Sequence, residues 1–292
     1  MKAIFSRKGF DSVCGGFPSP ILPYGEMISL PIPSGDSLRY SDLKIKNEIT
    51  YCELMKQLRL MIKTNDEWHR INEETTCHLD PDIHENMIDR KPGWRSCFGQ
   101  SGSAQGHLKN QGVCKNDLFL FFGWFRKTKF CNDKLEYDPL ERGKHAIFGY
   151  FQIDEIVKVD REYRVPDWMS YHPHASESSK SNDSNTIYIA RPKLSWNSLL
   201  PGSGRFEFRE DLVLTKQGHS RSKWCLPDCF SDAEISFHNR DSWKEGYFQS
   251  ASIGQEFVIK DNKNVEEWAK NLIKGANIYI YINRWIKYEI NR

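Results

Sequence analysis

The N-terminal segment combines side chains and glycines that could bind a phosphate group. Residues 3–5 are apolar and favour a strand, and residues 6–16 add hydroxyls, two cations, a carboxylate and glycines. Glycines let backbone N–H groups approach a ligand, while Arg and Lys supply donors that match phosphate oxygens. A turn with solvated charges explains the same composition without a ligand. We expect a nucleotide-binding loop, with Asp11 as a catalytic carboxylate, formed by Ser6, Arg7, Lys8, Ser12, Gly15 and Gly16.

A histidine and two carboxylates follow at residues 78–82, in the sequence HLDPD. Proline at 81 keeps this segment out of a regular helix. His and Asp at this spacing form a general acid–base pair or share a divalent metal, and we expect His78 and Asp80 to be catalytic. Asp80 or Asp82 would otherwise cap the next helix. Capping is favoured over metal binding, because no fourth ligand accompanies these residues.

A second histidine motif lies at 171–174, in the sequence YHPH. On an extended segment, His172 and His174 would project to the same side. Together with His78 and Asp82 they are candidate metal ligands. Such pairs are more often structural or simply exposed, so the motifs predict no metal centre and leave any cofactor unknown.

Glu256 is a further candidate for general-base chemistry. It lies between amide-bearing and apolar residues in the sequence FQSASIGQEFV at 248–258. Partial burial there would raise its pKa towards the range of a general base. An exposed Glu at the start of a strand is the alternative interpretation.

Residues 93–108 form a glycine-punctuated segment that suits a nucleobase. Gln side chains offer both a donor and an acceptor to a base edge, and aromatic rings offer a stacking face. Tight turns whose polar groups satisfy one another are the alternative. The expected base-binding residues are Trp94, Phe98, Gln100, His107 and Trp124.

The elements that position these residues follow from hydrophobic patterning. Apolar residues recur at helical spacing over 54–62 and 265–273, and continuous apolar runs predict an antiparallel strand pair at 117–125 and 146–157. Shorter strands are expected at 186–190, 211–215 and 278–282. We predict one α+β domain over residues 1–292, built on a mixed, mostly antiparallel curled sheet or barrel with flanking helices. Any barrel-like core would span about 93–260.

Composition narrows the class of partner. The 292 residues carry a formal net charge of +2, which disfavours a broad non-specific DNA-binding groove. Eight scattered cysteines do not resemble a disulfide-stapled secreted module. No apolar stretch approaches the about 20 residues of a membrane helix, and no signal peptide opens the chain. We expect a reduced, cytoplasmic protein without membrane contacts.

The chain resembles the nucleotide modification associated domain 3 family of bacteria and phages. The similar stretches are FSRKGFDS at 5–12, GG-PSPIL at 15–22, SLPIP at 29–33, HLDPD at 78–82, GWRSCFGQSGSAQGHL at 93–108, NDLFLFFGWFR at 116–126, YHPH at 171–174 and FQSASIGQEFV at 248–258. The resemblance implies a role in DNA or nucleotide modification, in a phage or bacterial defence setting, without a settled reaction. The run NDLFLFFGWFR followed by IFGYFQIDEIV is also similar to the strand pattern of PUA-like and EVE-like barrels, which hold a flipped modified base.

Two functions follow from these features. The first is an enzyme acting on a nucleotide or nucleobase, because functional side chains on glycine-rich loops outnumber what a binding module needs. The second is a non-catalytic reader of modified bases in nucleic acid. The partner is a nucleotide or modified nucleobase, free or within DNA, because a near-neutral charge favours a small ligand or extruded base over long duplex contacts. Protein partners are unknown. We favour the enzyme.

Overall fold

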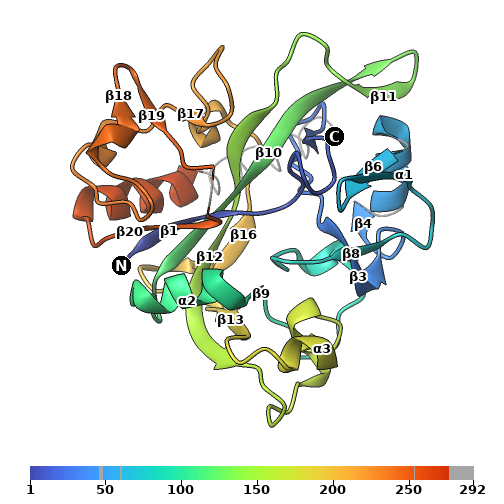
Figure 1. The fold of residues 1–292 in the computed structure, drawn as a ribbon, viewed down its shortest axis with the longest axis horizontal. Coiled ribbons are helices and arrows are strands. Elements are labelled where there is room, and N and C mark those ends of the chain that lie inside the picture. Colours follow the sequence, from blue (N-terminus) through green and yellow to red (C-terminus); the bar gives the residue numbers. More distant parts are fainter. Residues whose placement is uncertain (46–48, 60, 253, 276–292) are drawn as a thin grey trace, which may run out of the picture.

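A mixed sheet organises the protein. The computed structural model describes residues 1–45, 49–59, 61–252 and 254–275, among which the largest sheet has nine strands (Figure 1). Six of them follow the order β20-β1-β10-β12-β13-β9. Over the described residues this sheet does not close on itself. The prediction of a curled sheet is therefore confirmed, and the alternative of a barrel is wrong. Its strands are β1 (Ala3–Arg7), β2 (Ser19–Ile21), β9 (Cys97–Gln100), β10 (Leu118–Cys131), β11 (Lys134–Tyr137), β12 (Lys144–Lys158), β13 (Thr186–Ala190), β16 (Ser203–Arg205) and β20 (Glu256–Ile259).

Strands β10 and β12 form the centre of the sheet because both are apolar on both faces. They pair antiparallel, with Leu120 opposite Tyr150, which confirms the predicted strand pair. β1 runs parallel to β10 on its other side, with Phe5 opposite Leu120. β20 then pairs antiparallel with β1. The first strand is therefore held between two partners, and the end of β1 is firmly positioned.

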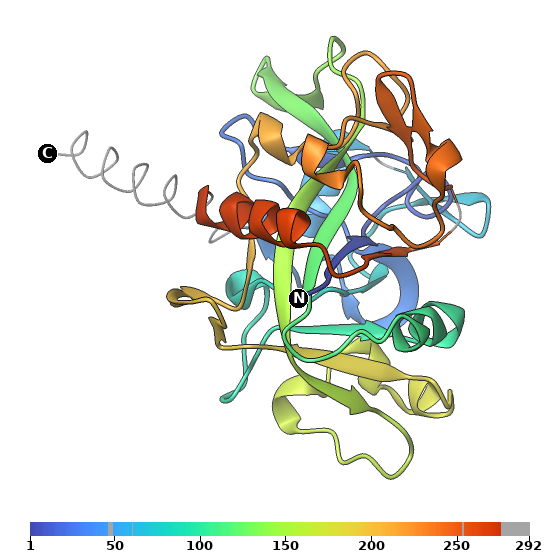
Figure 2. The same ribbon diagram turned by 90° about the vertical axis from the view of Figure 1, so that its left-hand side faces the viewer.

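The two faces of this sheet support separate cores. Phe5 packs on one face with Phe257 and with the helix of residues 263–275. Ile4 belongs to the other face, where Phe98 is buried. Figure 2 shows the helix of residues 263–275 on one side of the long strands and α2 (Gly102–Asn110) on the other. Neighbouring residues of β1 therefore reach different environments, as the alternation of a strand requires.

A smaller layer of residues 32–87 lies beside the sheet (Figure 1). It is built around an antiparallel pair of β3 and β8. Helix α1 begins with a capping box, in which Thr50 and Glu53 satisfy each other's backbone N–H groups. The elements of this layer are β3 (Ile32–Arg39), β4 (Lys44–Ile45), β5 (Ile49–Thr50), α1 (Tyr51–Leu58), β6 (Met61–Thr64), β7 (Glu67–Arg70), β8 (Thr76–His78) and η2 (Glu85–Met87).

The helix predicted over 54–62 was wrong in its second half. α1 ends at Leu58, and residues from Met61 form strand β6 instead. β6 turns into β7 through Asn65 and Asp66, which adopt φ values of 51° and 65°. Both residue types tolerate the left-handed conformation that a tight hairpin needs. The local turn chemistry therefore overrides the helical spacing.

The remaining elements are short. The strand expected at 211–215 was wrong, since a 3-10 turn occupies its start and only single bridges follow at Val213 and Thr215. The strand expected at 278–282 lies outside the described residues. The remaining elements are η3 (Asp167–Met169), η4 (Pro173–Ala175), α3 (Glu177–Lys180), β14 (Lys193–Leu194), β15 (Asn197–Pro201), η5 (Glu210–Leu212), β17 (Lys223–Trp224), η6 (Asp228–Phe230), η7 (Arg240–Ser242), β18 (Trp243–Lys244) and β19 (Tyr247–Gln249).

Two sequence properties can be compared with the structure directly. All eight cysteines are described, and each is free. Among the helices in the described ranges, none combines the length and apolar composition needed to cross a bilayer.

Candidate metal centre

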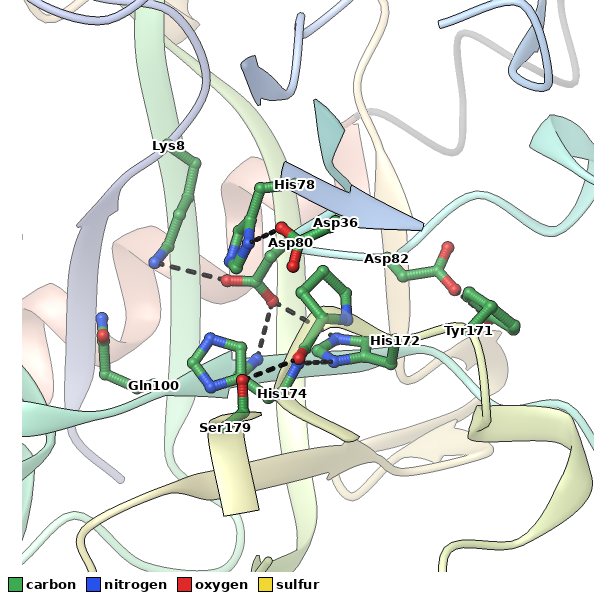
Figure 3. A network of polar contacts seen from close by, with 12 residues as sticks. Lys8, Asp36, His78, Asp80, Asp82, Gln100, Tyr171, His172, His174 and Ser179 are labelled. Atoms are coloured by element: carbon green, nitrogen blue, oxygen red, sulfur yellow. Dashed lines mark hydrogen bonds and ion pairs between the residues drawn. The ribbon is translucent and has the colours of Figure 1, made fainter. Parts of the chain in front are cut away.

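Strand β8 delivers two of the predicted residues to one place. His78 is its last residue and lies opposite Ile32 of β3. The backbone N–H of Asp80 donates to the His78 carbonyl over 2.9 Å, so the chain turns sharply between them. Leu79 is buried between the two and anchors this turn. The side chains of His78 and Asp80 consequently point into the same space (Figure 3).

His174 arrives from the far side of this space, on the short turn η4. Its backbone N–H donates to Nδ1 of His172 over 3.2 Å, which fixes the start of the turn. Its ring lies so close to β9 that a Cβ atom at Gly99 would come within 2.2 Å of it. Glycine at position 99 is therefore a steric requirement for placing His174.

One group of side chains in the described part of the chain has the geometry to share a metal ion. It consists of His78, Asp80 and His174, whose ligand atoms all lie within 4.8 Å of one another. Figure 3 shows the three converging from β8 and η4. Two imidazoles and one carboxylate are ligands that divalent transition metals accept. Three protein ligands also leave coordination positions for water or a substrate atom.

Each histidine of this triad is oriented by a second side chain. Nδ1 of His78 lies 2.8 Å from Oδ2 of Asp36, and Nδ1 of His174 lies 2.7 Å from Oδ1 of Asn185. The Asn185 amide donates from Nδ2 to two backbone carbonyls, so its oxygen must be the atom that faces His174. Both rings therefore place the proton on Nδ1 and leave the Nε2 lone pair free. This arrangement is typical of metal-ligating histidines.

The charge state of the triad also suits a cation. Burial lowers the pKa of His174 to about 4, so its ring is neutral at pH 7. Burial alone would raise the pKa of the Asp80 carboxyl, but the facing His172 ring and the charge of Lys8 outweigh it and hold this pKa below its usual range. Asp80 accepts a hydrogen bond from the Gly99 N–H at 2.7 Å, on Oδ1. The triad thus offers the neutral ring of His174 and the ionised carboxylate of Asp80, beside the imidazole of His78.

A second charged pair adjoins Asp80. Nζ of Lys8 lies 3.8 Å from Oδ2 of Asp80 and 3.4 Å from Oε1 of Glu256, and it also sits 4.2 Å from the centre of the Phe98 ring. Glu256 is only 1% exposed, and its Oε1 accepts a hydrogen bond from Gln100 at 2.7 Å. Its other oxygen has no partner in the described structure. A buried acceptor without a donor is costly, so this oxygen needs a donor that the described side chains do not supply.

A family model described as nucleotide modification associated domain 3 matches residues 2–260. The chain belongs to this family. The matched range includes the whole triad and the residues that orient it, and the family's description associates the chain with nucleotide modification. No curated protein and no solved structure matches the chain.

Asp82 does not join the triad in this member of the nucleotide modification associated domain 3 family. Its carboxylate receives both arms of Arg90 at 2.6 and 2.7 Å, together with the Trp94 indole N–H at 3.1 Å and the Tyr171 hydroxyl. Figure 3 shows it pointing to Tyr171 and away from Asp80. Neither Asp80 nor Asp82 caps the next helical turn, because η2 follows His84 without a side-chain cap. The capping interpretation was wrong.

The residues expected in one phosphate loop are spread over several environments. Lys8 faces the triad, whereas Arg7 donates to the carbonyls of Ala251 and Ser252 at 2.9 and 3.3 Å. The Asp11 carboxylate accepts from backbone N–H groups of its own turn. Gly15 serves packing, since a Cβ atom there would meet the Phe10 ring at 2.1 Å, and Gly16 is packed against Trp68 in the same way. Ser6 is buried and Ser12 is exposed.

The residues expected around a base do not surround a single space. Phe98 is fully buried in the core, and Trp94 belongs to the Asp82 network. His107 contacts Ser236 at 2.9 Å, and Trp124 lies under Arg221, whose guanidinium is 3.9 Å from the ring centre. Gln100 is linked to the triad through its bond to Glu256, which pairs with Lys8.

Two residues that complete the site were not identified from the sequence. Asp36 is an isolated acid in the proline-rich N-terminal stretch, and Asn185 ends a polar serine-rich segment. Neither belongs to a motif. The available signal was the His-x-Asp spacing at 78–80, which marks a ligand pair whose histidines need orienting partners elsewhere in the chain.

Proposed function

We propose that this protein is a metal-dependent enzyme that acts on a nucleotide or nucleobase within a nucleotide-modification system. The observation that supports this most directly is the triad of His78, Asp80 and His174 with its two orienting partners. Membership of the nucleotide modification associated domain 3 family supports the substrate class. DNA as the polymer, and a phage or bacterial defence setting, are part of the proposal.

A divalent transition metal such as Zn²⁺ or Fe²⁺ fits the donor set, because imidazole suits both and the carboxylate adds one negative charge. Bound there, it would activate water or polarise a substrate oxygen. His78 and His174 bind through their free Nε2 atoms, since Asp36 and Asn185 occupy the Nδ1 side. Asp80 supplies the third ligand.

Lys8 and Glu256 give the site polar groups beyond the ligands. The Lys8 ammonium adjoins Asp80 and would stabilise negative charge on a phosphate or on a reacting oxygen. The unpartnered oxygen of Glu256 is the nearby proton acceptor. These groups favour an enzyme over a reader of modified bases. The aromatic residues that a reader would use for stacking are buried or engaged elsewhere.

The decisive test combines metal content with turnover. We expect purified protein supplied with Zn²⁺ or Fe²⁺ to bind one ion per chain by elemental analysis, and the His78→Ala and His174→Ala variants to lose it. Co²⁺ substitution would report the nitrogen ligands through its visible absorption. His69→Ala is the matched control, because His69 is an exposed histidine on strand β7 and does not belong to the triad.

Turnover is measured by mass spectrometry of nucleosides after incubation with a panel of nucleotides and single-stranded DNA. We expect a mass change with the metal-loaded protein and none with Asp80→Ala. Binding of a modified base without any mass change would support the reader instead. Full metal occupancy in both histidine variants would contradict the proposed centre.

A further inference from the structure

Strand β1 ends in two cations that serve opposite faces of the sheet. Lys8 lies against Phe98, beside the triad, as Figure 3 shows for its side chain. Arg7 lies on the other face, with its guanidinium carbon 5.8 Å from the Phe122 ring and 5.9 Å from the Phe257 ring. Those two rings belong to the opposite core. Arg7 therefore takes no part in the metal centre, and its position points to a separate role.

A second arginine lies beside the same aromatic cluster, because the Phe122 ring under Arg7 packs at 5.1 Å against Trp224, whose indole donates to the Arg221 carbonyl. Arg221 stacks on Trp124 with its guanidinium carbon 3.9 Å from the ring centre, and Trp124 is paired with His145 in the sheet. Its backbone carbonyl is held by Thr215 at 3.2 Å and by the Trp224 indole at 3.0 Å. Arg221 is thus fixed at both its backbone and its side chain, which is the preorganisation that a ligand site needs.

Few acceptor atoms of neighbouring residues pair with the N–H groups of these two guanidinium groups. Within the described ranges, the Arg221 guanidinium makes no hydrogen bond or ion pair, and the buried Nε of Arg7 has no partner. Each terminal nitrogen of Arg7 donates to one backbone carbonyl, of Ser252 and Ala251 respectively. Guanidinium groups match phosphate through forked hydrogen bonds. The missing partner is therefore a group rich in acceptors.

The electrostatics of this locality support an anion. Burial lowers the pKa of both Arg7 and Arg221, and the charge of Arg7 further lowers that of Arg221. Burial and both arginines lower the pKa of His145 to about 3, so His145 stays neutral. Asp11 is the nearby acid that opposes these effects on the arginines. One carboxylate faces two arginines, which leaves a net positive charge.

We infer that Arg7 and Arg221 form an anion site for a phosphate group, on the sheet face opposite the metal centre. The phosphate comes either from a free nucleotide or from the backbone of a single-stranded nucleic acid. The anion site itself needs no metal.

The test measures binding of three probes in low salt: inorganic phosphate, thymidine monophosphate and a fluorescent ten-residue oligothymidylate. We expect Arg221→Gln to weaken phosphate binding about tenfold or more, because a charged fork is lost. Arg221→Lys keeps the charge but loses the fork and the stack, so it should be intermediate. Arg161→Gln is the control, because Arg161 is exposed.

Comparison of the probes identifies the source of the phosphate. If the oligonucleotide binds more tightly than the monophosphate, Arg221→Gln should reduce the slope of log affinity against log salt by about 1. If the monophosphate binds equally well, the ligand is a free nucleotide. Arg221 is preferred to Arg7 as the test position, because Arg7 also tethers residues 251–252.

Three results would overturn the inference. The first is that the wild type binds none of the probes at millimolar concentration. The second is that Arg161→Gln loses as much affinity as Arg221→Gln. The third is that His78→Ala abolishes phosphate binding, which would assign the phosphate to the metal centre. Metal content in Arg221→Gln should equal that of the wild type. The proposal of the anion site and the proposal of the metal centre can therefore be tested independently.

Discussion

At the scale of single residues, the site depends as much on orientation as on ligand identity. The two histidines of the triad differ in their partners, since one faces a carboxylate and the other an amide oxygen. A carboxylate makes its imidazole the more basic ligand, whereas an amide only directs the ring. Asp36 and Asn185 are positioning residues that should tune metal affinity without touching the ion.

We predict that Asp36→Ala and Asn185→Ala each weaken metal affinity by about 10–100-fold, the usual effect of removing such a partner. Competition with a chromophoric chelator gives the dissociation constants. Asp183→Ala is the control, as an exposed acid two residues before Asn185. If all three variants bind metal like the wild type, the histidines are not the ligands.

The orientation of the His174 ring also depends on the absence of a side chain at Gly99. Gly99→Ala should displace the His174 ring, because the added Cβ atom would come within 2.2 Å of it. We expect loss of metal and a lower unfolding midpoint. Gly106→Ala has open space around it in α2 and should raise stability by up to about 1 kcal/mol. Calorimetry with metal analysis distinguishes the two, and equal behaviour would refute the steric argument.

At the scale of elements, the segment from β8 to β9 carries two acids with different tasks. Asp80 belongs to the triad, while Asp82 is fully buried against Arg90. The two are separated by a single proline. Their separation is maintained because Asp82 exchanges backbone hydrogen bonds with Cys97.

Asp82→Ala should lower the free energy of unfolding by about 3–5 kcal/mol, since it leaves a buried arginine without its partner. Metal content of the folded protein should persist. Asp80→Ala should also lower stability, because Lys8 and the Gly99 N–H each lose a partner, but unlike Asp82→Ala it should lose the metal. Urea unfolding and elemental analysis separate the two, with exposed Asp89→Ala as control. Loss of metal in Asp82→Ala at unchanged stability would contradict these roles.

Much of the central sheet could be predicted because its signal is local. The apolar runs that became β10 and β12 are long and continuous, and they need no distant information. His78 and Asp80 were likewise predicted from adjacent residues. The YHPH motif predicted His172 and His174 on one side, and their ring centres lie 5.8 Å apart. Pro173 begins a 3-10 turn between them, and Nε2 of His172 also lies 3.5 Å from Oδ1 of Asp80, so their spacing alone could not tell which ring joins the triad.

At the scale of the whole molecule, buried histidines couple stability to pH. The pKa of His145 is lowered to about 3 in the folded protein, against 6.5 for the ordinary side chain. Between these values the unfolded chain binds a proton that the folded chain does not. The free energy of unfolding must therefore fall as pH drops below 6.5. His84 contributes in the same direction, with a pKa of about 3 from burial and neighbouring arginines.

His145→Gln should flatten this dependence by up to about 1.4 kcal/mol per pH unit, because glutamine does not titrate. Its amide oxygen can still accept the Trp224 indole N–H that His145 accepts at 3.2 Å. Urea unfolding at pH 7 and pH 5 gives the slope for each protein. Identical slopes would show that His145 gains a proton in the folded state.

The ligands of the triad also lie far apart along the chain. Residues 78–80 leave the ribosome long before residue 174, so an ion can be captured only late in synthesis. Once bound, the ion cross-links residues 78–80 to residue 174 and closes the chain between them into a loop. At a hundredfold excess over its dissociation constant, the ion adds about 2.7 kcal/mol to the free energy of unfolding. Chelation should therefore expose the turn around Pro173 to proteases first, while the strands laid down between the ligands stay protected.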